Sequence, residues 1–303
     1  MAVDKDYTAL LRRLRRPGGP VDAVLDTDTY NEIDDQFALS YMIRSGEKIR
    51  VRGLYAAPFF NHNSESPADG MEKSFDEILH LLKLADREDL IPFVQRGSDR
   101  YLPSETEAVE SPAARALIAE AKAHTPENPL YVVAIGAITN VASAILMDGS
   151  IIDRIVVVWL GGHSFEWPHT KEFNMYQDVA AARVIFGCGA AVVQLPCMGV
   201  VSGFISTEPE LKALFGGKNA LCDYLVRHTC EYMGDRPCWS KVIWDVTAVA
   251  WLLDEDFMED RIVPAPIPQY DFRYSHDPDR HPAKYVWHIN RDALMADLAE
   301  KLT

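Results

Sequence analysis

Four aspartates crowded between residues 26 and 35 constrain the fold of this chain more than any other feature. A short apolar run precedes Asp26 and Asp28, and a stretch with helical periodicity follows Asp34 and Asp35. Like charges this close repel one another, and burying them without partners is costly. The acids fall where a strand ends and a helix begins, which in an open α/β sheet is the edge that binds ligands.

A helix start explains only part of this cluster. Asp34 and Asp35 suit the first turn of a helix, where acids interact favourably with the dipole. Asp28 at the strand end is better explained by a hard divalent cation, which takes carboxylate and carbonyl oxygens. A third acid is expected from the distant segment 242–248, where Asp245 opens an apolar stretch. Read alone, Asp245 is also a plausible helix N-cap.

Strand-like and helix-like segments alternate through most of the chain, which is typical of βαβ units around a parallel sheet. The expected strands are 23–25, 50–56, 91–94, 130–135, 155–160 and 190–195, and the expected helices are 71–85, 111–123, 139–147 and 179–186. The near-continuous Val, Ile and Leu runs indicate strands buried on both faces. We therefore expect an α/β fold: an open, mostly parallel central sheet flanked by helices, in one domain over residues 1–303.

The rest of the chain follows a different pattern. From about residue 207 to Trp251 the periodicity is helical, so a helical C-terminal part is expected. The segment 264–282 is rich in Pro, Asp, His, Arg and Tyr and is typical of a loop or lid. Residues 11–16 are expected to form a solvated amphipathic helix.

Composition limits the class of ligand. The formal net charge of −15 argues against nucleic acid and anionic membranes as partners, and suits a neutral or cationic ligand or a metal ion. No apolar run reaches the roughly 18 residues of a membrane span. The five cysteines include no Cys-x-x-Cys pair, which favours a reducing cytoplasm. A zinc site at Cys222, Cys230 and Cys238 is a weaker alternative, because zinc ligands are usually closer in sequence.

Four segments, in order along the chain, resemble the nucleoside hydrolase family. They are DTDTYNEIDD at 26–35, AIGAITNVA at 134–142, KEFNMYQDVAA at 171–181 and IWD at 243–245. The family opens with Asp-x-Asp-Pro-Gly-x-Asp-Asp after its first strand. Here the loop is two residues longer and lacks the Pro-Gly turn. The resemblance implies a Rossmann-like nucleoside hydrolase fold.

Carried over residue by residue, the resemblance implies a Ca²⁺ site. Asp28, Asp35 and Asp245 would hold the ion together with the backbone carbonyl of Ile135, with Mg²⁺ a weaker alternative. Asp28 would also be the general base that activates water for attack on the sugar. Asp26 would support these acids from behind.

The resemblance also implies a sugar site. Asp34 would bind ribose hydroxyls, and Asn174 and Glu172 would hold the sugar from the opposite side. Asn61, or Asn63 beside it, would replace a further sugar-binding asparagine of the family. The close Gly161-Gly162 pair is interpreted either as a close approach to ligand or as a plain turn.

The chain departs from the family where the base is recognised. Trp244 stands where some members carry a histidine that helps the base to leave, so Trp244 or Trp167 is a candidate for stacking on the base. His163, His169 and His276 are candidate acids. In the longer loop, Asn31 and Glu32 are expected to reach into or over the pocket, so that the substrate accepted here differs from the family norm.

The expected function is Ca²⁺-dependent hydrolysis of the N-glycosidic bond of a ribonucleoside or related N-riboside, serving purine or pyrimidine salvage in the cytoplasm. A homodimer or homotetramer is expected. Two alternatives remain open. One is a nucleoside- or sugar-binding homologue with impaired catalysis. The other is a haloacid-dehalogenase-type phosphatase, because Asp26-x-Asp28 also matches the first motif of that class.

Overall fold

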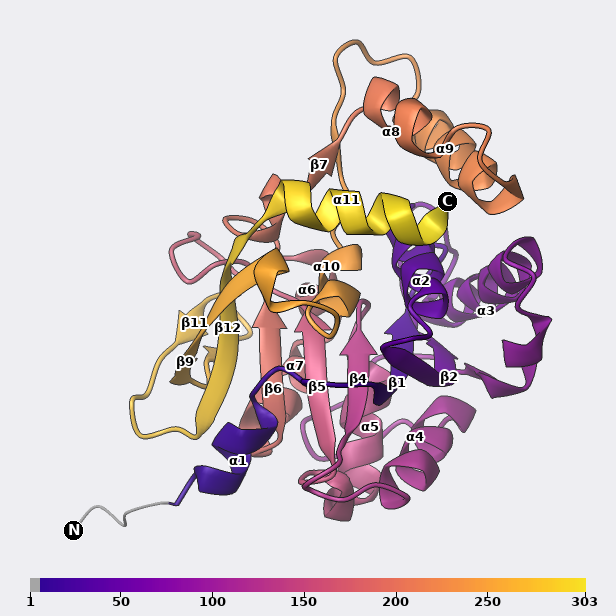
Figure 1. Ribbon diagram of the computed structural model, residues 1–303. Helices are drawn as coiled ribbons and strands as arrows, with labels where there is room; N and C mark the ends of the chain where they lie inside the picture. Colours follow the sequence, from indigo (N-terminus) through magenta and orange to yellow (C-terminus); the bar gives the residue numbers. More distant parts are fainter. Residues whose placement is uncertain (1–5) are drawn as a thin grey trace.

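The structure is a computed structural model that describes residues 6–303, and its centre is an eight-stranded sheet (Figure 1). The strand order is β3-β2-β1-β4-β5-β6-β12-β9. All neighbours are parallel except β12 and β9, which pair antiparallel. The strands are β1 Val21–Thr27, β2 Ile49–Ala56, β3 Val94–Arg96, β4 Leu130–Ala134, β5 Ile155–Leu160, β6 Ala191–Leu195, β9 Met258–Pro264 and β12 Pro282–Ile289. The predicted α/β class and the open, mostly parallel sheet are confirmed.

Helices cover both faces of this sheet (Figure 1). They are α1 Thr8–Arg13, α2 Asp34–Arg44, α3 Pro67–Leu84, α4 Pro112–Lys122, α5 Thr139–Met147, α6 Phe173–Gln177, α7 Val179–Gly187, α8 Glu208–Phe215, α9 Ala220–Met233, α10 Val246–Ala250 and α11 Arg291–Leu302. Short 3-10 turns occupy Glu88–Phe93, Gly149–Ile151, Val201–Gly203 and Glu255–Phe257. The predicted cap of α4 is present: the Ser111 side chain accepts from the Ala114 N–H, and Pro112 opens the helix.

The sheet separates two apolar layers. Leu25 and Val133 pack into the layer under α2, α3, α10 and α11. Val24 and Val132, one position along each strand, pack into the layer under α4, α5 and α7. Successive strand residues point to opposite faces, so the central strands are buried on both sides, as their apolar runs predicted.

The helices expected between about residue 207 and Trp251 are confirmed as α8, α9 and α10, and strands that were not expected follow them. After α10 the chain adds β9 and β12 to the sheet, and 264–282 contains the short hairpin of β10 Ile267–Pro268 and β11 Tyr274–Ser275. The sequence MEDRIVP of β9 is mostly exposed or half-buried, as suits an edge strand, and so it lacks an apolar run. Upstream, β7 Ile205–Ser206 pairs with β8 Lys241–Val242. The strand expected at 91–94 is displaced, since Glu88–Phe93 is a 3-10 helix and β3 begins at Val94.

The N-terminal helix α1 ends at Arg13, within the basic run 11–16. α1 buries Leu10 and is followed by buried Leu14, while Arg16 forms an ion pair with Asp260 on β9. Segment 11–16 is therefore partly docked on the sheet edge rather than freely solvated. No helix within residues 6–303 has the length and apolar character needed to cross a bilayer.

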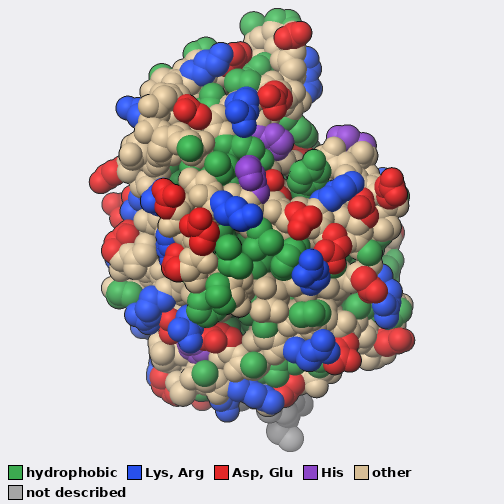
Figure 2. All heavy atoms as spheres, turned by 90° about the vertical axis from the view of Figure 1, so that its right-hand side faces the viewer, with side chains coloured by type: hydrophobic (Ala, Val, Ile, Leu, Met, Phe, Trp, Pro, Cys, Tyr) green, Lys and Arg blue, Asp and Glu red, His purple; other side chains and the backbone are tan. Residues whose placement is uncertain are grey.

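The surface on the α3 side mixes both signs of charge. Figure 2 shows apolar side chains gathered in the middle of this face, bordered by acidic and basic groups without a continuous basic area. Among residues 6–303, the cluster able to hold a metal ion is made of aspartates and includes none of the three cysteines considered for zinc. Cys222 is instead buried and its Sγ donates to the Leu302 carbonyl.

Candidate functional site

A pocket of about 250 Å³ opens at the carboxyl ends of the central strands. Ile135 and Leu160, at the ends of β4 and β5, form part of its lining. The starts of α2, α6 and α10 contribute acidic and amide side chains. This is the edge of a parallel sheet at which ligands bind, and the sequence placed the acidic cluster there.

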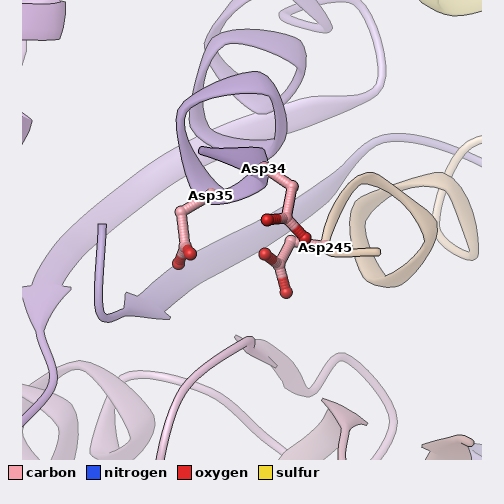
Figure 3. A group of neighbouring side chains, drawn as sticks. All are labelled: Asp34, Asp35 and Asp245. Atoms are coloured by element: carbon pink, nitrogen blue, oxygen red, sulfur yellow. The ribbon is translucent and has the colours of Figure 1, made fainter. Parts of the chain in front are cut away.

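Three carboxylates converge beside this pocket. Asp34 and Asp35 lie in the first turn of α2, and Asp245 lies directly before α10. Each offers an oxygen within 4.8 Å of the others, and all three side chains are buried. Figure 3 shows the three side chains turning into the same space between the two helices. Burial, and then the charge of Asp34, raises the pKa of Asp35 to about 7. The same two causes raise the pKa of Asp245 well above its usual range.

Asp28, a predicted metal ligand, is not part of this three-carboxylate cluster and does not line the pocket, but its carboxylate feels the charges of Asp35 and Asp34 and has no hydrogen-bond partner in the part of the chain that the structure describes. Within the described residues, both of its carboxylate oxygens are buried and unpaired. A Cβ added to Gly136 would lie 3.0 Å from Asp28 Oδ1, so glycine lets the start of the β4–α5 turn approach this carboxylate. Burial and the charge of Asp35 raise the pKa of Asp28 well above its usual range. An unpaired buried carboxylate beside three more acids suits a hard divalent cation.

Asp26 lies behind these acids on β1. Its Oδ1 accepts from the Asn140 side-chain amide at 2.7 Å, and burial raises its pKa to about 7. Asp26 is fully buried and does not line the pocket. Thr27 on the same strand donates to Asp35 Oδ1 at 2.5 Å and fixes its rotamer.

Asp34 is engaged by two protein donors. Its Oδ1 accepts from the ammonium of Lys241 at 3.1 Å, and its Oδ2 accepts from the Trp244 N–H at 3.0 Å. Lys241 also lies 2.6 Å from Glu32 Oε2. The sequence analysis named Asp34, Trp244 and Glu32 but missed Lys241, whose position in the apolar-flanked segment WSKVIWD gave no motif signal.

The longer loop is held in place by two asparagines. Asn61 Nδ2 donates to Asn31 Oδ1 at 2.6 Å, and Asn63 Nδ2 donates to the Asn31 carbonyl at 2.8 Å. Asn31 and Glu32 line the pocket as expected. Asn61 does not line it, and its side chain is hydrogen-bonded to Asn31 instead. Asn61 therefore contacts the loop rather than the pocket in this structure.

Glu172 and Asn174 line the pocket and also hold its backbone through hydrogen bonds. Glu172 accepts from the N–H groups of Asn174 and Met175 as the N-cap of α6, and from the Gly162 N–H at 2.8 Å. Burial raises the pKa of Glu172 to about 6, although these hydrogen bonds act to lower it. Asn174 Nδ2 donates to the carbonyls of Ile135 at 3.1 Å and Leu160, which joins the ends of β4 and β5.

Position 162 needs glycine for two reasons, its backbone conformation and the close approach of a neighbouring side chain. Its φ of +76° is in the left-handed region, and a Cβ there would lie 2.1 Å from the Tyr274 hydroxyl. Tyr274 belongs to the segment suggested as a lid, but it is buried against Gln194 and no residue of 264–282 lines the pocket.

Among the aromatic and histidine candidates, Trp244 and His163 line the pocket. The His163 Nδ1 accepts from the Met198 N–H at 3.2 Å, so the ring proton lies on Nε2. Burial, and then His169, lowers the pKa of His163 to about 4. Trp167 packs against the His163 ring, with centroids 5.8 Å apart. His276 packs on Phe165 away from the pocket lining.

Five lining residues were missed by sequence reasoning: Leu160, Lys171, Phe173, Cys197 and Met198. Lys171 and Phe173 alternate with Glu172 and Asn174. Cys197 and Met198 follow the end of β6, so the rule that parallel strands present ligand sites at their carboxyl ends was a usable signal for them.

Comparison with known proteins gives a consistent family. The sequence model of the inosine-uridine preferring nucleoside hydrolases matches residues 23–295. Over 166 residues the chain is 26% identical to a probable uridine nucleosidase 2 of Arabidopsis thaliana, covering 53% of this chain and 49% of that protein. Over 151 residues it is 26% identical to an inosine-uridine preferring nucleoside hydrolase of Crithidia fasciculata, covering 48% and 47%. The matched stretches thus span about half the length of these two relatives.

Solved structures share the fold along nearly the whole chain. A plant nucleoside hydrolase superposes with a TM-score of 0.74 at 22% identity, covering 94% of this chain and 99% of that one. A purine-preferring ribonucleoside hydrolase from Gardnerella vaginalis superposes with a TM-score of 0.68 at 19% identity, covering 93% and 98%. At sequence identities this low, the structural similarity establishes only that the proteins share a fold.

Proposed function

The chain belongs to the inosine-uridine preferring nucleoside hydrolase family, and from this premise we propose that it hydrolyses the N-glycosidic bond of a ribonucleoside or related N-riboside. The products are the free base and ribose, which purine or pyrimidine salvage would use. The observation that carries the proposal is the pair of unpartnered, buried Asp28 oxygens, which feel the charges of the neighbouring cluster of Asp34, Asp35 and Asp245.

These acids suit a bound Ca²⁺. Asp28, Asp35 and Asp245 are the proposed carboxylate ligands, and the Ile135 carbonyl, which lines the pocket, is the proposed backbone ligand. A divalent cation supplies charge that lowers the pKa of water and anchors vicinal hydroxyls. Oxygen-only ligands of this kind favour Ca²⁺ or Mg²⁺ over softer metals. Ca²⁺ is preferred because its coordination tolerates an irregular, partly backbone ligand set.

Asp28 is the proposed general base. Its carboxylate takes a proton from water as the water oxygen bonds to C1′ of the ribose, and the C1′–N bond breaks with its electron pair on the base, which leaves as an anion and takes a proton from solvent water. The transition state resembles an oxocarbenium ion, so the surrounding carboxylates stabilise its positive charge. Asp34, Asn174 and Glu172 line the pocket, and they are the proposed partners of the ribose hydroxyls.

The leaving base meets a different environment. Trp244 offers an aromatic surface where the base can stack, and His163, which also lines the pocket, carries its proton on Nε2. With a pKa of about 4, His163 is neutral near pH 7, so it can donate a hydrogen bond to the base but is a poor source of a full proton. We propose that it orients the base rather than protonating it.

A panel of nucleosides tests this function. Purified protein with Ca²⁺ is incubated with inosine, adenosine, guanosine, uridine and cytidine, and the products are separated by chromatography. Equal amounts of free base and ribose from at least one nucleoside are expected. Saturable binding of the same nucleosides with no release of base would instead favour the binding homologue that lacks catalysis.

A further inference from the structure

An ion-pair triad of Lys241, Glu32 and Asp34, in which Lys241 and Asp34 are buried, shares Asp34 with the acidic cluster. The ammonium of Lys241 is 2.6 Å from Glu32 Oε2 and 3.1 Å from Asp34 Oδ1. The Lys241 and Asp34 side chains are 7% and 3% exposed, whereas that of Glu32 is 37% exposed. Burial alone would lower the pKa of Lys241, but the charges of Asp34 and Glu32 outweigh it and raise the pKa. Lys241 is therefore a fixed positive charge at working pH.

The triad joins three separate parts of the chain. Glu32 belongs to the longer loop, Asp34 opens α2, and Lys241 lies on β8, more than 200 residues away in sequence. The Tyr232 ring of α9 also faces the ammonium, with its centroid 5.9 Å away. Lys241 is thus held in position from both sides rather than free to leave the site.

Asp34 connects this charge to the metal site. One of its oxygens lies within 4.8 Å of ligand oxygens from Asp35 and Asp245, while Oδ1 accepts from Lys241. A cation bound among these acids and the ammonium of Lys241 therefore share the field of the same carboxylate. Two positive charges a few ångströms apart in a poorly solvated site repel strongly. The lysine must weaken cation binding, and Glu32 must oppose that effect.

We propose that Lys241 is a positioning residue whose positive charge lowers the affinity of the site for a divalent cation. Lys241 is not itself one of the oxygen ligands. The negative charge of Glu32 partly cancels its effect. The inference rests on the proposed function, because it presupposes a cation at Asp28, Asp35 and Asp245. It assigns a purpose to the longer loop: the extra residues bring Glu32 to Lys241.

Calorimetric titration of metal-free protein with CaCl₂ tests the proposal without reference to activity. Lys241→Met removes the positive charge at similar length, so its Ca²⁺ dissociation constant should fall about tenfold. Glu32→Gln removes the opposing charge and should raise that constant about threefold, a smaller change because Glu32 is more exposed and better screened. The double variant, which has the same net charge as the wild type, should lie between the two single variants.

The decisive result is that the two single variants change the Ca²⁺ dissociation constant in opposite directions. If the triad served only to hold the loop, both single variants would bind Ca²⁺ more weakly and the double variant at least as weakly as either. An unchanged or larger dissociation constant for folded Lys241→Met overturns the proposal. Should that variant not fold, tighter or unchanged binding by Glu32→Gln overturns it instead. Wild-type protein that binds no Ca²⁺ or Mg²⁺ would overturn the metal site and this inference together, whereas normal wild-type binding without the shifts overturns the inference alone.

Discussion

At the scale of single residues, Asp28 has the least ordinary environment in the described chain, since both of its buried oxygens lack partners. Replacing it with asparagine keeps the shape and removes both the base and a charged ligand. We expect Asp28→Asn to lower kcat for nucleoside hydrolysis by about 10²–10⁴. Asp271→Asn, at an exposed turn, is the matched control and should leave kcat unchanged. A loss of only a few-fold in Asp28→Asn would show that another group is the base.

His163 gives a prediction about acid stability. Its pKa of about 4 in the folded chain lies below the ordinary value of 6.5, so the native state binds fewer protons than the unfolded state between these pH values. The stability that His163 contributes is complete above about pH 6.5 and is lost as the pH falls towards 4. His163→Asn keeps an acceptor for the Met198 N–H and cannot titrate.

Urea unfolding at pH 5 and pH 7.5 measures this difference. The denaturation midpoint of the wild type should fall more between pH 7.5 and pH 5 than that of His163→Asn. Equal falls in the two proteins would show that His163 carries no share of the acid sensitivity.

The sequence was most informative where the site is local. Asp28, Asp34 and Asp35 could be selected because they share one short motif, and Asn174 and Glu172 because they share another. Lys241 could not, because its meaning depends on Asp34, a residue 207 positions away. Similarly, nothing in the sequence showed that Asn61 contacts Asn31 rather than the pocket.

At the scale of elements, the turn after β5 has no room for a side chain at Gly162. Gly162→Ala would force a left-handed φ on a residue with a Cβ and bring that atom against Tyr274. We expect a loss of at least about 1 kcal/mol in unfolding free energy. Gly187→Ala, at the end of α7 where an added Cβ meets nothing within 4 Å, should be neutral or slightly stabilising. Thermal unfolding of the two variants compares them directly.

Elements with long apolar runs could be predicted, and those with mixed patterns could not. β5 begins and ends at the residues the sequence indicated, because IVVVWL is buried throughout. β9 and β12 were overlooked because half of their residues face solvent or the sheet edge, and β12 also carries a register shift near His288. Strands of this kind are recognised by their partners rather than by composition.

At the scale of the whole molecule, the last strand ties the C-terminal part to the centre. β12 lies between β6 and β9, so residues 282–289 complete the sheet (Figure 1). The single domain expected over residues 1–303 remains a prediction, and it implies one cooperative unfolding transition. Circular dichroism and tryptophan fluorescence should give coincident urea transitions. Two separated transitions would divide the chain into independent units.

The expected homodimer or homotetramer is likewise a prediction for the whole molecule. Light scattering coupled to size-exclusion chromatography should return two or four times the chain mass of 34.0 kDa. A monomer over the micromolar range would contradict it.

The most direct test of the central claim is ribose release measured before and after metal withdrawal. The wild-type protein is assayed with its best nucleoside as purified, after exhaustive EDTA treatment, and after Ca²⁺ or Mg²⁺ is restored in excess of the chelator. We predict that ribose release is lost with EDTA and recovers with Ca²⁺, more fully than with Mg²⁺. Undiminished release in the metal-free protein would contradict the assignment of Asp28, Asp35 and Asp245 to a catalytic cation.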